Sequence, residues 1–249
     1  MKQREKILSK LKELEKEHKV KFLWAIESGS RAWGFASEDS DFDVRCIHVG
    51  RKEDYLGLFP PKSQINFSDG KLDIESWDIK KFAELTLKSN PQIAEWLRSP
   101  IVYLDSDVKK NFKNLFDKGC SLEFLRIHYF RMAKQNYHKY VGSGMSHSCK
   151  KYLYVLRAIA CANYIEQENK LPPLPYKEVI LYLPEKIRQF FEKCVIEKNK
   201  TEKATILTNK DVLNYVEKKI NNLPKKEIKN FDGIEKLNNY IINVIFNVK

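Results

Sequence analysis

Apolar residues in the first hundred positions follow two different spacings, which predicts helices alternating with strands. Between residues 3 and 19 they recur every three or four positions among lysines and glutamates, as in an amphipathic helix. Residues 78–87 and 92–98 show a similar helical spacing. Apolar or alternating runs of strand length occupy residues 22–26, 41–49, 63–67, 71–76 and 101–104. The third and fourth runs are separated by Ser68-Asp69-Gly70, and Asp-Gly between alternating runs is typical of a β-hairpin.

Beyond about residue 105 the alternating pattern disappears and only helical spacing remains. Helices are predicted at 105–117, 121–141, 147–168, 184–197, 209–222 and 232–247. The change predicts an α+β protein with two domains: an α/β catalytic domain over residues 1–105 and an all-helical domain over residues 106–249.

Composition narrows the class of protein. The 249 residues are 43% hydrophobic and 31% charged, as in a globular protein, and no apolar run is long enough to cross a bilayer. The charged N-terminus shows no secretory signal, and the five dispersed cysteines favour reduced thiols in a cytoplasmic protein. The formal net charge of +12 favours a polyanionic partner such as RNA, although a general bias towards lysine would produce the same charge.

The candidate chemistry is concentrated between Gly29 and Arg45. An apolar strand ends at Ser28-Gly29-Ser30, where glycine allows the backbone to approach a ligand and where backbone amides can bind an anion. Asp41 and Asp43 follow about a dozen residues later, and alternation along a strand places both side chains on one face. Two adjacent carboxylates repel each other unless a cation lies between them. A phosphate site beside a paired carboxylate site is suited to metal-dependent nucleotidyl transfer.

These residues resemble the hallmark of the DNA polymerase β-like nucleotidyltransferase superfamily, Gly-Ser followed after a spacer by Asp-x-Asp. The fuller wording, from Gly29-Ser-Arg-Ala-Trp-Gly34 to Ser40-Asp-Phe-Asp43, is similar to one branch, the RNA-repair-pathway polymerase β family (RlaP-like). The resemblance covers residues from about 20 to 170 and implies a polymerase β-like palm. It also calls for a third carboxylate on a neighbouring strand. Asp73, between Leu72 and Ile74, is the first candidate and Glu75 is the alternative.

If the reaction is nucleotidyl transfer, further residues in and around this motif have expected roles. Asp41, Asp43 and Asp73 are the expected catalytic residues and ligands of two Mg²⁺ or Mn²⁺ ions, since hard cations prefer oxygen ligands. Gly29 and Ser30 are expected to hold the phosphates of the nucleoside triphosphate (NTP). Arg31 either contacts the triphosphate or pairs with Glu38 or Asp39. Ser40 is also expected to belong to the nucleotide-binding site, where its main role is to orient the Asp-x-Asp turn.

A second cluster lies at the start of the helix predicted at 147–168. Lys150, Tyr154 and Arg157 are spaced so that they share one helical face, and this stretch also resembles the RlaP-like branch. Tyrosine can stack on a base while lysine and arginine neutralise phosphate, so these residues are predicted to bind the nucleotide. The alternative is an ordinary amphipathic helix with solvated basic residues.

The resemblance and the positive charge together imply a Mg²⁺-dependent transfer of a nucleotide from an NTP to an RNA end, in repair or maturation, with tRNA among the candidate acceptors. Two alternatives remain open at this point. The same palm could modify a hydroxyl of a protein or a small molecule, or it could be a non-catalytic RNA-binding module. The three intact carboxylates argue against the second alternative.

Overall fold

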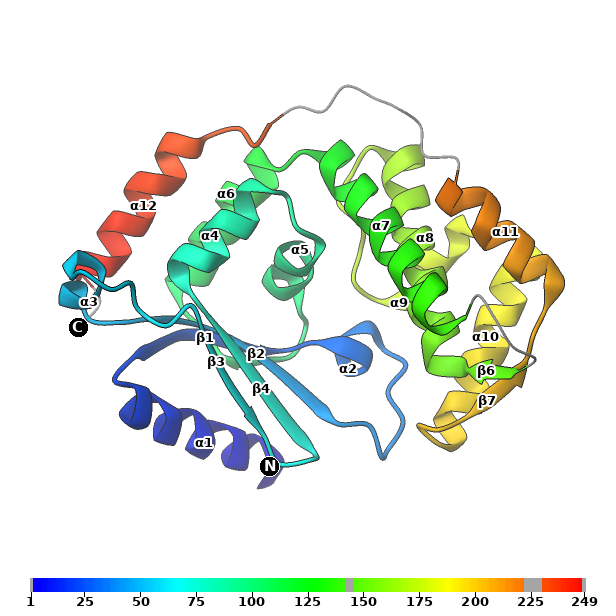
Figure 1. Ribbon diagram of the computed structural model, residues 1–249, viewed down its shortest axis with the longest axis horizontal. Coiled ribbons are helices and arrows are strands. Elements are labelled where there is room, and N and C mark those ends of the chain that lie inside the picture. Colours follow the sequence, from blue (N-terminus) through cyan, green and yellow to red (C-terminus); the bar gives the residue numbers. More distant parts are fainter. Residues whose placement is uncertain (1, 142–145, 222–229, 248–249) are drawn as a thin grey trace. The chain divides into compact units, whose positions relative to one another are not determined.

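The computed structural model describes residues 2–141, 146–221 and 230–247 of the chain (Figure 1). These residues form two compact units. The sheet unit comprises Met1–Ala32, Asp41–Cys120 and Asn230–Lys249, and the helical unit comprises Trp33–Ser40 and Ser121–Lys229. The chain therefore leaves the sheet unit after Ala32 and returns to it at Asp41.

The sheet unit is built on a five-stranded sheet among the described residues. Its strands are β1 (Lys21–Glu27), β2 (Phe42–Val49), β3 (Gln64–Ser68), β4 (Leu72–Asp78) and β5 (Val102–Leu104), in the order β3-β4-β2-β1-β5. Strands β2 and β4 are parallel, whereas the other neighbouring pairs are antiparallel. The predicted β3–β4 hairpin is present.

Helices cover both faces of this sheet. The helices of the sheet unit are α1 (Lys2–His18), α2 (Gly29–Trp33), α3 (Lys52–Leu56), α4 (Ile79–Leu87), α5 (Pro91–Arg98), α6 (Asp107–Gly119) and α12 (Ile234–Asn247). On one face, α1 buries Ile7, Leu11 and Leu14 in a cluster with side chains of β1, β2 and β4. On the other face, Trp24 of β1 contacts the rings of Phe82 in α4 and Phe112 in α6. Figure 1 shows α1 on the opposite side of the sheet from α4 and α6. The two sides of β1 are thus both buried, as its continuous apolar run predicts.

The helical unit is organised around one buried helix. It contains α7 (Leu122–Tyr140), α8 (Cys149–Glu168), α9 (Tyr176–Val179), the 3-10 helix η1 (Ile180–Tyr182), α10 (Glu185–Lys200) and α11 (Lys210–Asn221). Most residues of α8 are buried, including a continuous run from Val155 to Asn163. Two short antiparallel strands, β6 (Ser146–Ser148) and β7 (Thr205–Leu207), add a small ladder that the expectation of an all-helical domain did not include.

The structure confirms the predicted α+β fold class, a mixed five-stranded sheet with flanking helices and a largely helical part after it. The division of the chain differs from the predicted boundary at residue 105. Helix α6 packs on β1 through Phe112, and Tyr240 of α12 contacts the ring of Phe112 and hydrogen-bonds Asn111. A Cβ atom on Gly119 would overlap the carbonyl oxygen of Asp232, so the segment before α12 lies tightly against the end of α6. Helical periodicity reveals an apolar face, but it cannot reveal which unit that face packs on.

No helix in the described part of the chain combines the length and the apolar character that a bilayer crossing requires.

Candidate active site

The turn after β1 brings its backbone against the first strand carboxylate. Gly29 has φ = +60°, and a Cβ atom at this position would overlap Oδ2 of Asp43. The amide of Ser28 donates a hydrogen bond of 2.8 Å to the carbonyl of Asp43, and Ser30 is buried. Only glycine fits both this backbone conformation and this close approach. Gly29 and Asp43 are therefore adjacent in space although fourteen positions separate them.

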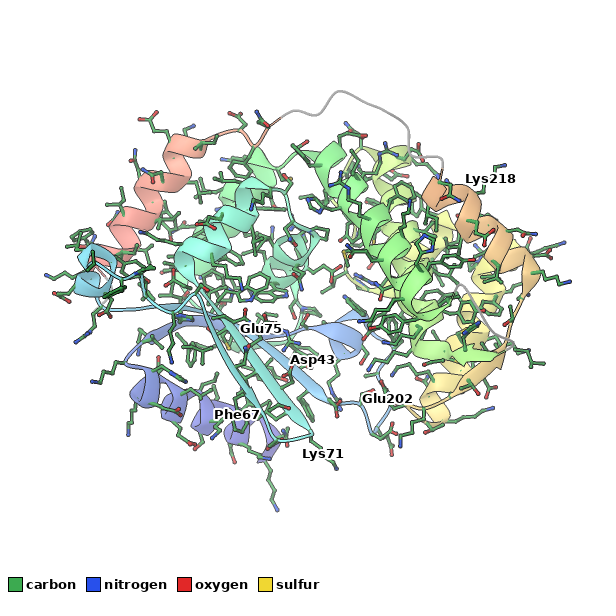
Figure 2. All side chains as sticks on the ribbon, in the orientation of Figure 1. Asp43, Phe67, Lys71, Glu75, Glu202 and Lys218 are labelled. Atoms are coloured by element: carbon green, nitrogen blue, oxygen red, sulfur yellow. The ribbon has the colours of Figure 1, made fainter. Side chains whose placement is uncertain are left out.

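Parallel pairing brings two of the predicted carboxylates together. Asp43 of β2 and Asp73 of β4 are register partners, so their side chains leave the same face of the sheet. Asp41 precedes β2 and is exposed. Figure 2 labels Asp43 and Glu75, which lie on these neighbouring strands. Among the residues that the structure describes, no group of three or more histidine, cysteine or acidic side chains is already placed to hold a metal ion.

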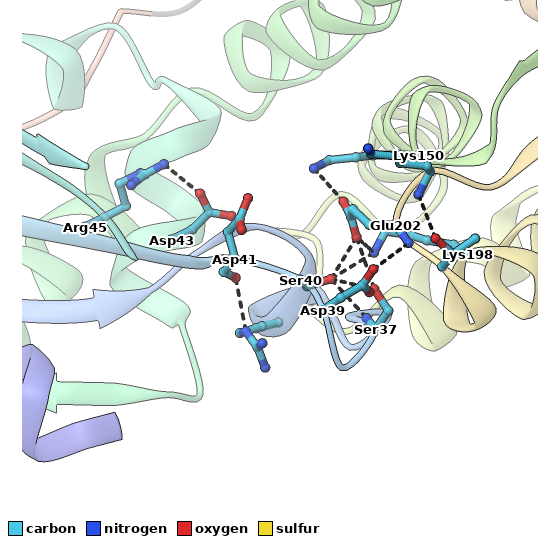
Figure 3. A network of polar contacts seen from close by, with 12 residues as sticks. Ser37, Asp39, Ser40, Asp41, Asp43, Arg45, Lys150, Lys198 and Glu202 are labelled. Atoms are coloured by element: carbon cyan, nitrogen blue, oxygen red, sulfur yellow. Dashed lines mark hydrogen bonds and ion pairs between the residues drawn. The ribbon is translucent and has the colours of Figure 1, made fainter. Parts of the chain in front are cut away.

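Arg45 provides the cation that this pair of carboxylates requires. It lies two positions after Asp43 on the same face, with its guanidinium 3.0 Å from Oδ1 of Asp43 and 2.8 Å from Oδ2 of Asp73 (Figure 3 draws the contact with Asp43). Its Nε atom is 3.7 Å from Oε2 of Glu75. The site thus attracts positive charge, and the oxygen donor set is the one that Mg²⁺ and Mn²⁺ prefer. The donor chemistry fits a divalent cation, while the arginine contacts show that the carboxylates adopt an arrangement suited to a guanidinium.

The two candidates for the third carboxylate have different surroundings. Glu75 accepts hydrogen bonds from Nε1 of Trp77 at 2.7 Å and from Nε2 of Gln64 at 2.8 Å. Asp73 is the register partner of Asp43 and contacts the same guanidinium. These contacts favour Asp73 as the partner of Asp43 in cation binding, because the Glu75 carboxylate is already engaged by neutral donors.

A buried glutamate beneath the site was not among the predicted residues. Glu27, at the end of β1, has no exposed surface, and it accepts hydrogen bonds from the amide of Asp43 at 2.8 Å and from the hydroxyl of Tyr103. Burial raises the pKa of Glu27, and the hydrogen bonds from Tyr103 and Asp43 oppose this rise. Glu27 therefore fixes the backbone at Asp43. Its position at the end of an apolar strand was a signal, but strand alternation does not distinguish a buried carboxylate from an exposed one.

Arg31 packs against the residues that flank Asp41. Its Nε atom donates to the carbonyl of Asp41 at 3.1 Å, and its guanidinium lies 3.9 Å from the ring centroid of Phe42. The sequence left two roles open for Arg31. In this structure the side chain braces the Asp41 backbone and the Phe42 ring.

The second predicted cluster lies in the helical unit and meets the loop of residues 33–40. Lys150 pairs with Oε1 of Glu202 at 2.7 Å, and Tyr154 contacts the ring of Trp33 edge-on at a centroid distance of 5.2 Å. Arg157 is buried, with its guanidinium 4.3 Å from the centroid of the Trp33 ring. The predicted shared face of α8 is thus present, and Trp33 is the residue that covers part of it.

Ser40 lies in a buried polar network within the helical unit (Figure 3). Its Oγ is 2.9 Å from Oε2 of Glu202 and 3.1 Å from Nζ of Lys198. Sequence reasoning missed Glu202 and Lys198, because they follow Ser40 by more than 150 positions and carry no motif.

The predicted site residues therefore fall into two groups. Gly29, Ser30, Arg31, Asp41, Asp43 and Asp73 belong to the sheet unit, and Ser40, Lys150, Tyr154 and Arg157 belong to the helical unit. Within the first group the structure brings Gly29, Asp43 and Asp73 together. Arg45 was inside the motif and could have been found from its spacing of two residues after Asp43.

Comparison with known proteins tests the resemblance seen in the sequence. Residues 3–243 match the family described as the RNA repair pathway DNA polymerase beta family, RlaP. The uncharacterized protein YcgL of Bacillus subtilis (strain 168) is 34% identical over 254 residues, which cover 98% of this chain and 96% of that protein. Among solved structures, a nucleotidyltransferase-like protein from Exiguobacterium sibiricum 255-15 aligns over 92% of this chain and 75% of its own, with 9% identity and a TM-score of 0.31. The family match continues to residue 243, whereas the resemblance seen in the sequence motifs ends at about residue 170. The chain belongs to the RNA repair pathway DNA polymerase beta family.

Proposed function

We propose that this protein is a Mg²⁺- or Mn²⁺-dependent nucleotidyltransferase that transfers a nucleoside monophosphate from an NTP to a hydroxyl at an RNA end and releases pyrophosphate. One observation carries the proposal. Asp43 and Asp73 pair in parallel register, and the Gly29 turn lies in contact with Asp43. A glycine turn beside two strand carboxylates supports the proposal, because nucleotidyl transfer needs a phosphate-binding turn next to ligands of a cation.

Asp41, Asp43 and Asp73 would hold the divalent cations. When bound, such ions neutralise the phosphate charge and stabilise the attacking and leaving oxygens. The contacts of Arg45 with Asp43 and Asp73 support this assignment, because they show that both carboxylates accept a cation on the same face of the sheet. The guanidinium has to give up at least one of these contacts when a metal ion binds.

The remaining residues of the sheet unit orient the reactants. Backbone groups at Gly29 and Ser30 would bind the triphosphate, and Arg31 adds positive charge beside Asp41. The acceptor hydroxyl loses its proton to Asp73, its oxygen bonds to the α-phosphorus, and the bond from that phosphorus to pyrophosphate breaks. Glu27 keeps the Asp43 backbone in place throughout, since it accepts a hydrogen bond from the Asp43 amide.

In the helical unit, Lys150 and Tyr154 would contact the nucleotide as a basic and an aromatic group. Arg157 is 3% exposed and lies on the Trp33 ring, so its proposed role is to support Trp33 and Tyr154 from beneath. Lys150 is half-buried and paired with Glu202, so binding of a phosphate would compete with that carboxylate.

The assignment of RNA as acceptor rests on family membership and on the net charge of +12. tRNA is the first acceptor to test, because its ends are frequent sites of repair and maturation. A cytoplasmic location is part of the same proposal and agrees with the reduced thiols expected from the dispersed cysteines.

The test is transfer of label from each α-labelled NTP, with Mg²⁺ or Mn²⁺, to mixed tRNA and to total cell protein. Asp43→Asn removes a proposed ligand, and Asp107→Asn is the matched control because Asp107 is an exposed residue of α6 that pairs with Lys110. Label is expected in RNA with the parent and the control but not with Asp43→Asn. Label in protein would redirect the proposal to protein nucleotidylation. No label from a folded parent would contradict an enzymatic role.

A further inference from the structure

The helical unit contains a long stretch of sequence without any acidic residue. Residues 124–165 include no aspartate or glutamate, so all 33 acidic residues of the chain lie outside this stretch. Most of it belongs to α7 and α8, which lie side by side within the helical unit (Figure 1). A general bias towards lysine does not explain this stretch, because such a bias would not remove the acidic residues. Its basic residues are Arg126, Arg131, Lys134, Lys139, Lys150, Lys151 and Arg157.

Most of these positive charges lie at the surface of the helical unit. Arg126 and Arg157 are buried, whereas the three remaining basic residues of α7 are exposed and the two lysines at the start of α8 are partly exposed. A surface that carries cations and no acidic side chain of its own attracts an anionic partner.

Two of these lysines meet at one exposed aromatic ring. Nζ of Lys151 lies 3.8 Å from the centroid of the Tyr140 ring, and Nζ of Lys139 lies 5.0 Å from the same centroid. Tyr140 is the last residue of α7 and is 36% exposed. A hydrogen bond from Lys139 lowers the pKa of the Tyr140 hydroxyl, and the charge of Lys151 acts in the same direction. The aromatic ring therefore brings together two ammonium groups from two helices.

This arrangement lacks a negative charge. Within the described part of the chain, no carboxylate forms a salt bridge with Lys139 or Lys151. Two ammonium groups beside one ring repel each other, and the electron-rich face of the ring offsets only part of that repulsion. An anion bound beside both lysines would remove the rest, and phosphate is the anion that the proposed substrates carry.

Lys151 also connects Tyr140 to a second aromatic residue. Its Nζ atom lies 6.0 Å from the centroid of the Tyr154 ring, on the same helix. Aromatic rings that alternate with basic groups are typical of surfaces that bind single-stranded nucleic acid, because bases stack on the rings while phosphates contact the cations. A double helix keeps its bases stacked on one another, so it cannot use the rings in this way. The chemistry of this surface therefore fits an unpaired strand.

We propose that Lys139, Tyr140 and Lys151 form a surface that binds an unpaired strand of RNA, with one base stacked on Tyr140 and the neighbouring phosphates on the two lysines. The inference rests on the proposed function in its choice of RNA as the partner, and it names the part of the chain that holds this RNA. The three residues are separate from the proposed ligands of the divalent cation, so RNA binding can be measured without the reaction.

The first experiment tests the stacking role of Tyr140. A fluorescently labelled RNA oligonucleotide without internal pairing is titrated with the full chain, and binding is followed by fluorescence anisotropy. Tyr140→Ala is expected to weaken binding about tenfold, because it removes the ring. Tyr140→Phe is the matched control, since it keeps the ring, and it is expected to bind within about twofold of the parent. The same strand paired with its complement is expected to bind equally well to the parent and to Tyr140→Ala.

The second experiment tests the lysines through the dependence of RNA binding on KCl concentration. Lys151→Gln is expected to make the slope of log Kd against log KCl concentration shallower by about 0.7, the value for one lost phosphate contact on a single strand. Lys218→Gln is the matched control, because Lys218 is an exposed lysine on α11 of the same unit and follows Glu217 in the chain (labelled in Figure 2). It is expected to leave the slope unchanged.

The outcomes separate this inference from the proposed function. A parent that does not bind the oligonucleotide would overturn the surface. So would equal affinity and equal salt dependence in the parent, Tyr140→Ala and Lys151→Gln, provided that thermal melting shows all three to be folded; transfer of label to RNA by the same parent would leave the proposed function in place. A parent that binds RNA through Tyr140 but transfers no label from any NTP would instead overturn the proposed function and leave the binding surface.

Discussion

The carboxylate site of the sheet unit and the polar network around Glu202 in the helical unit both pair acidic side chains with cations, yet they are assembled in different ways. In the sheet unit one guanidinium, that of Arg45, contacts Asp43 and Asp73 on adjacent strands. In the helical unit one carboxylate, that of Glu202, receives two ammonium groups and two hydroxyl groups. The first site has an excess of negative charge, and the second has an excess of donors.

This difference indicates which site can accept a ligand cation. Asp43 and Asp73 retain exposed fractions of 30% and 44% and both contact Arg45, so we propose that a divalent ion replaces this arginine. Lys198 is completely buried and Glu202 is saturated with donors, so the second network can only hold its parts in place. The proposal is therefore that the carboxylate site exchanges its cation and that the network around Glu202 does not.

The strongest test of the comparison distinguishes Asp73 from Glu75. Asp73→Asn is expected to lower nucleotidyl transfer by about a thousandfold or more, since it removes a charge that acts on the reacting groups. Glu75→Gln is expected to lower it less than about tenfold, because Trp77 and Gln64 already engage that carboxylate. Initial rates with labelled NTP and RNA measure the loss of activity in each variant. A larger loss in Glu75→Gln than in Asp73→Asn would reverse the assignment of the third carboxylate.

Strand periodicity explains why the carboxylate site of the sheet unit could be predicted in part from the sequence. The predicted strand at 41–49 is β2 (Phe42–Val49), and the predicted hairpin is β3 with β4. Alternation therefore placed Asp43 and Asp73 on defined faces of their strands. The parallel register that makes them partners is a long-range contact that alternation cannot predict. The family resemblance supplied only the expectation of a third carboxylate on a neighbouring strand.

The polar network of the helical unit could not be predicted from the sequence, because its residues are not related by any local spacing. The helices were found from their periodicity, but Glu202 and Ser40 are 162 positions apart, and no local pattern links them. Nor did the 33–40 loop carry any sign that it packs with α8, α9 and α10, since Trp33 and Phe35 would suit the core of either unit. Contacts of this kind depend on tertiary packing alone.

Acid is expected to destabilise the sheet unit through a buried histidine. His48 of β2 is 1% exposed and lies between Ser76 Oγ at 2.7 Å and the carbonyl of Lys62 at 3.2 Å. Burial lowers the pKa of His48 to about 4. The unfolded chain binds this proton near pH 6.5, so stability is present above that pH and is lost as pH falls towards 4, by up to about 3 kcal/mol.

The measurement is urea unfolding at several pH values for the parent, for His48→Gln and for His138→Gln, which changes an exposed histidine of α7. The difference between the parent and His48→Gln isolates this residue from other groups that titrate in the same range. A parent and a His48→Gln variant with the same pH dependence between 4 and 6.5 would show that His48 is not the acid-sensitive group.

In the helical unit the expected effect of Arg157→Ala is on stability. Its guanidinium lies on the Trp33 ring, and truncation of this buried side chain is expected to cost about 2 kcal/mol through lost cation–π contact and packing. Lys150→Ala, at a half-buried ion pair, is expected to cost less than about 1 kcal/mol but to raise the KM for NTP. A rise in KM for Arg157→Ala without loss of stability would return Arg157 to direct nucleotide binding.

The smallest expected effect concerns the exchange of Arg45 for a metal ion. Arg45→Gln removes the cation that contacts Asp43 and Asp73, so a divalent ion no longer competes with it, and Mn²⁺ affinity is expected to rise about three- to tenfold. The metal-free variant is also expected to be slightly less stable than the parent, because its two carboxylates then face each other without a cation.

Arg51→Gln is the matched control for Arg45→Gln, since Arg51 pairs with Asp54 through an exposed ion pair in the same unit. Titration of Mn²⁺ followed by electron paramagnetic resonance gives the affinities of all three proteins. If Arg45→Gln weakens Mn²⁺ binding, the guanidinium must help to hold the carboxylates for the metal. If it strengthens binding, Arg45 occupies the metal site until the ion arrives.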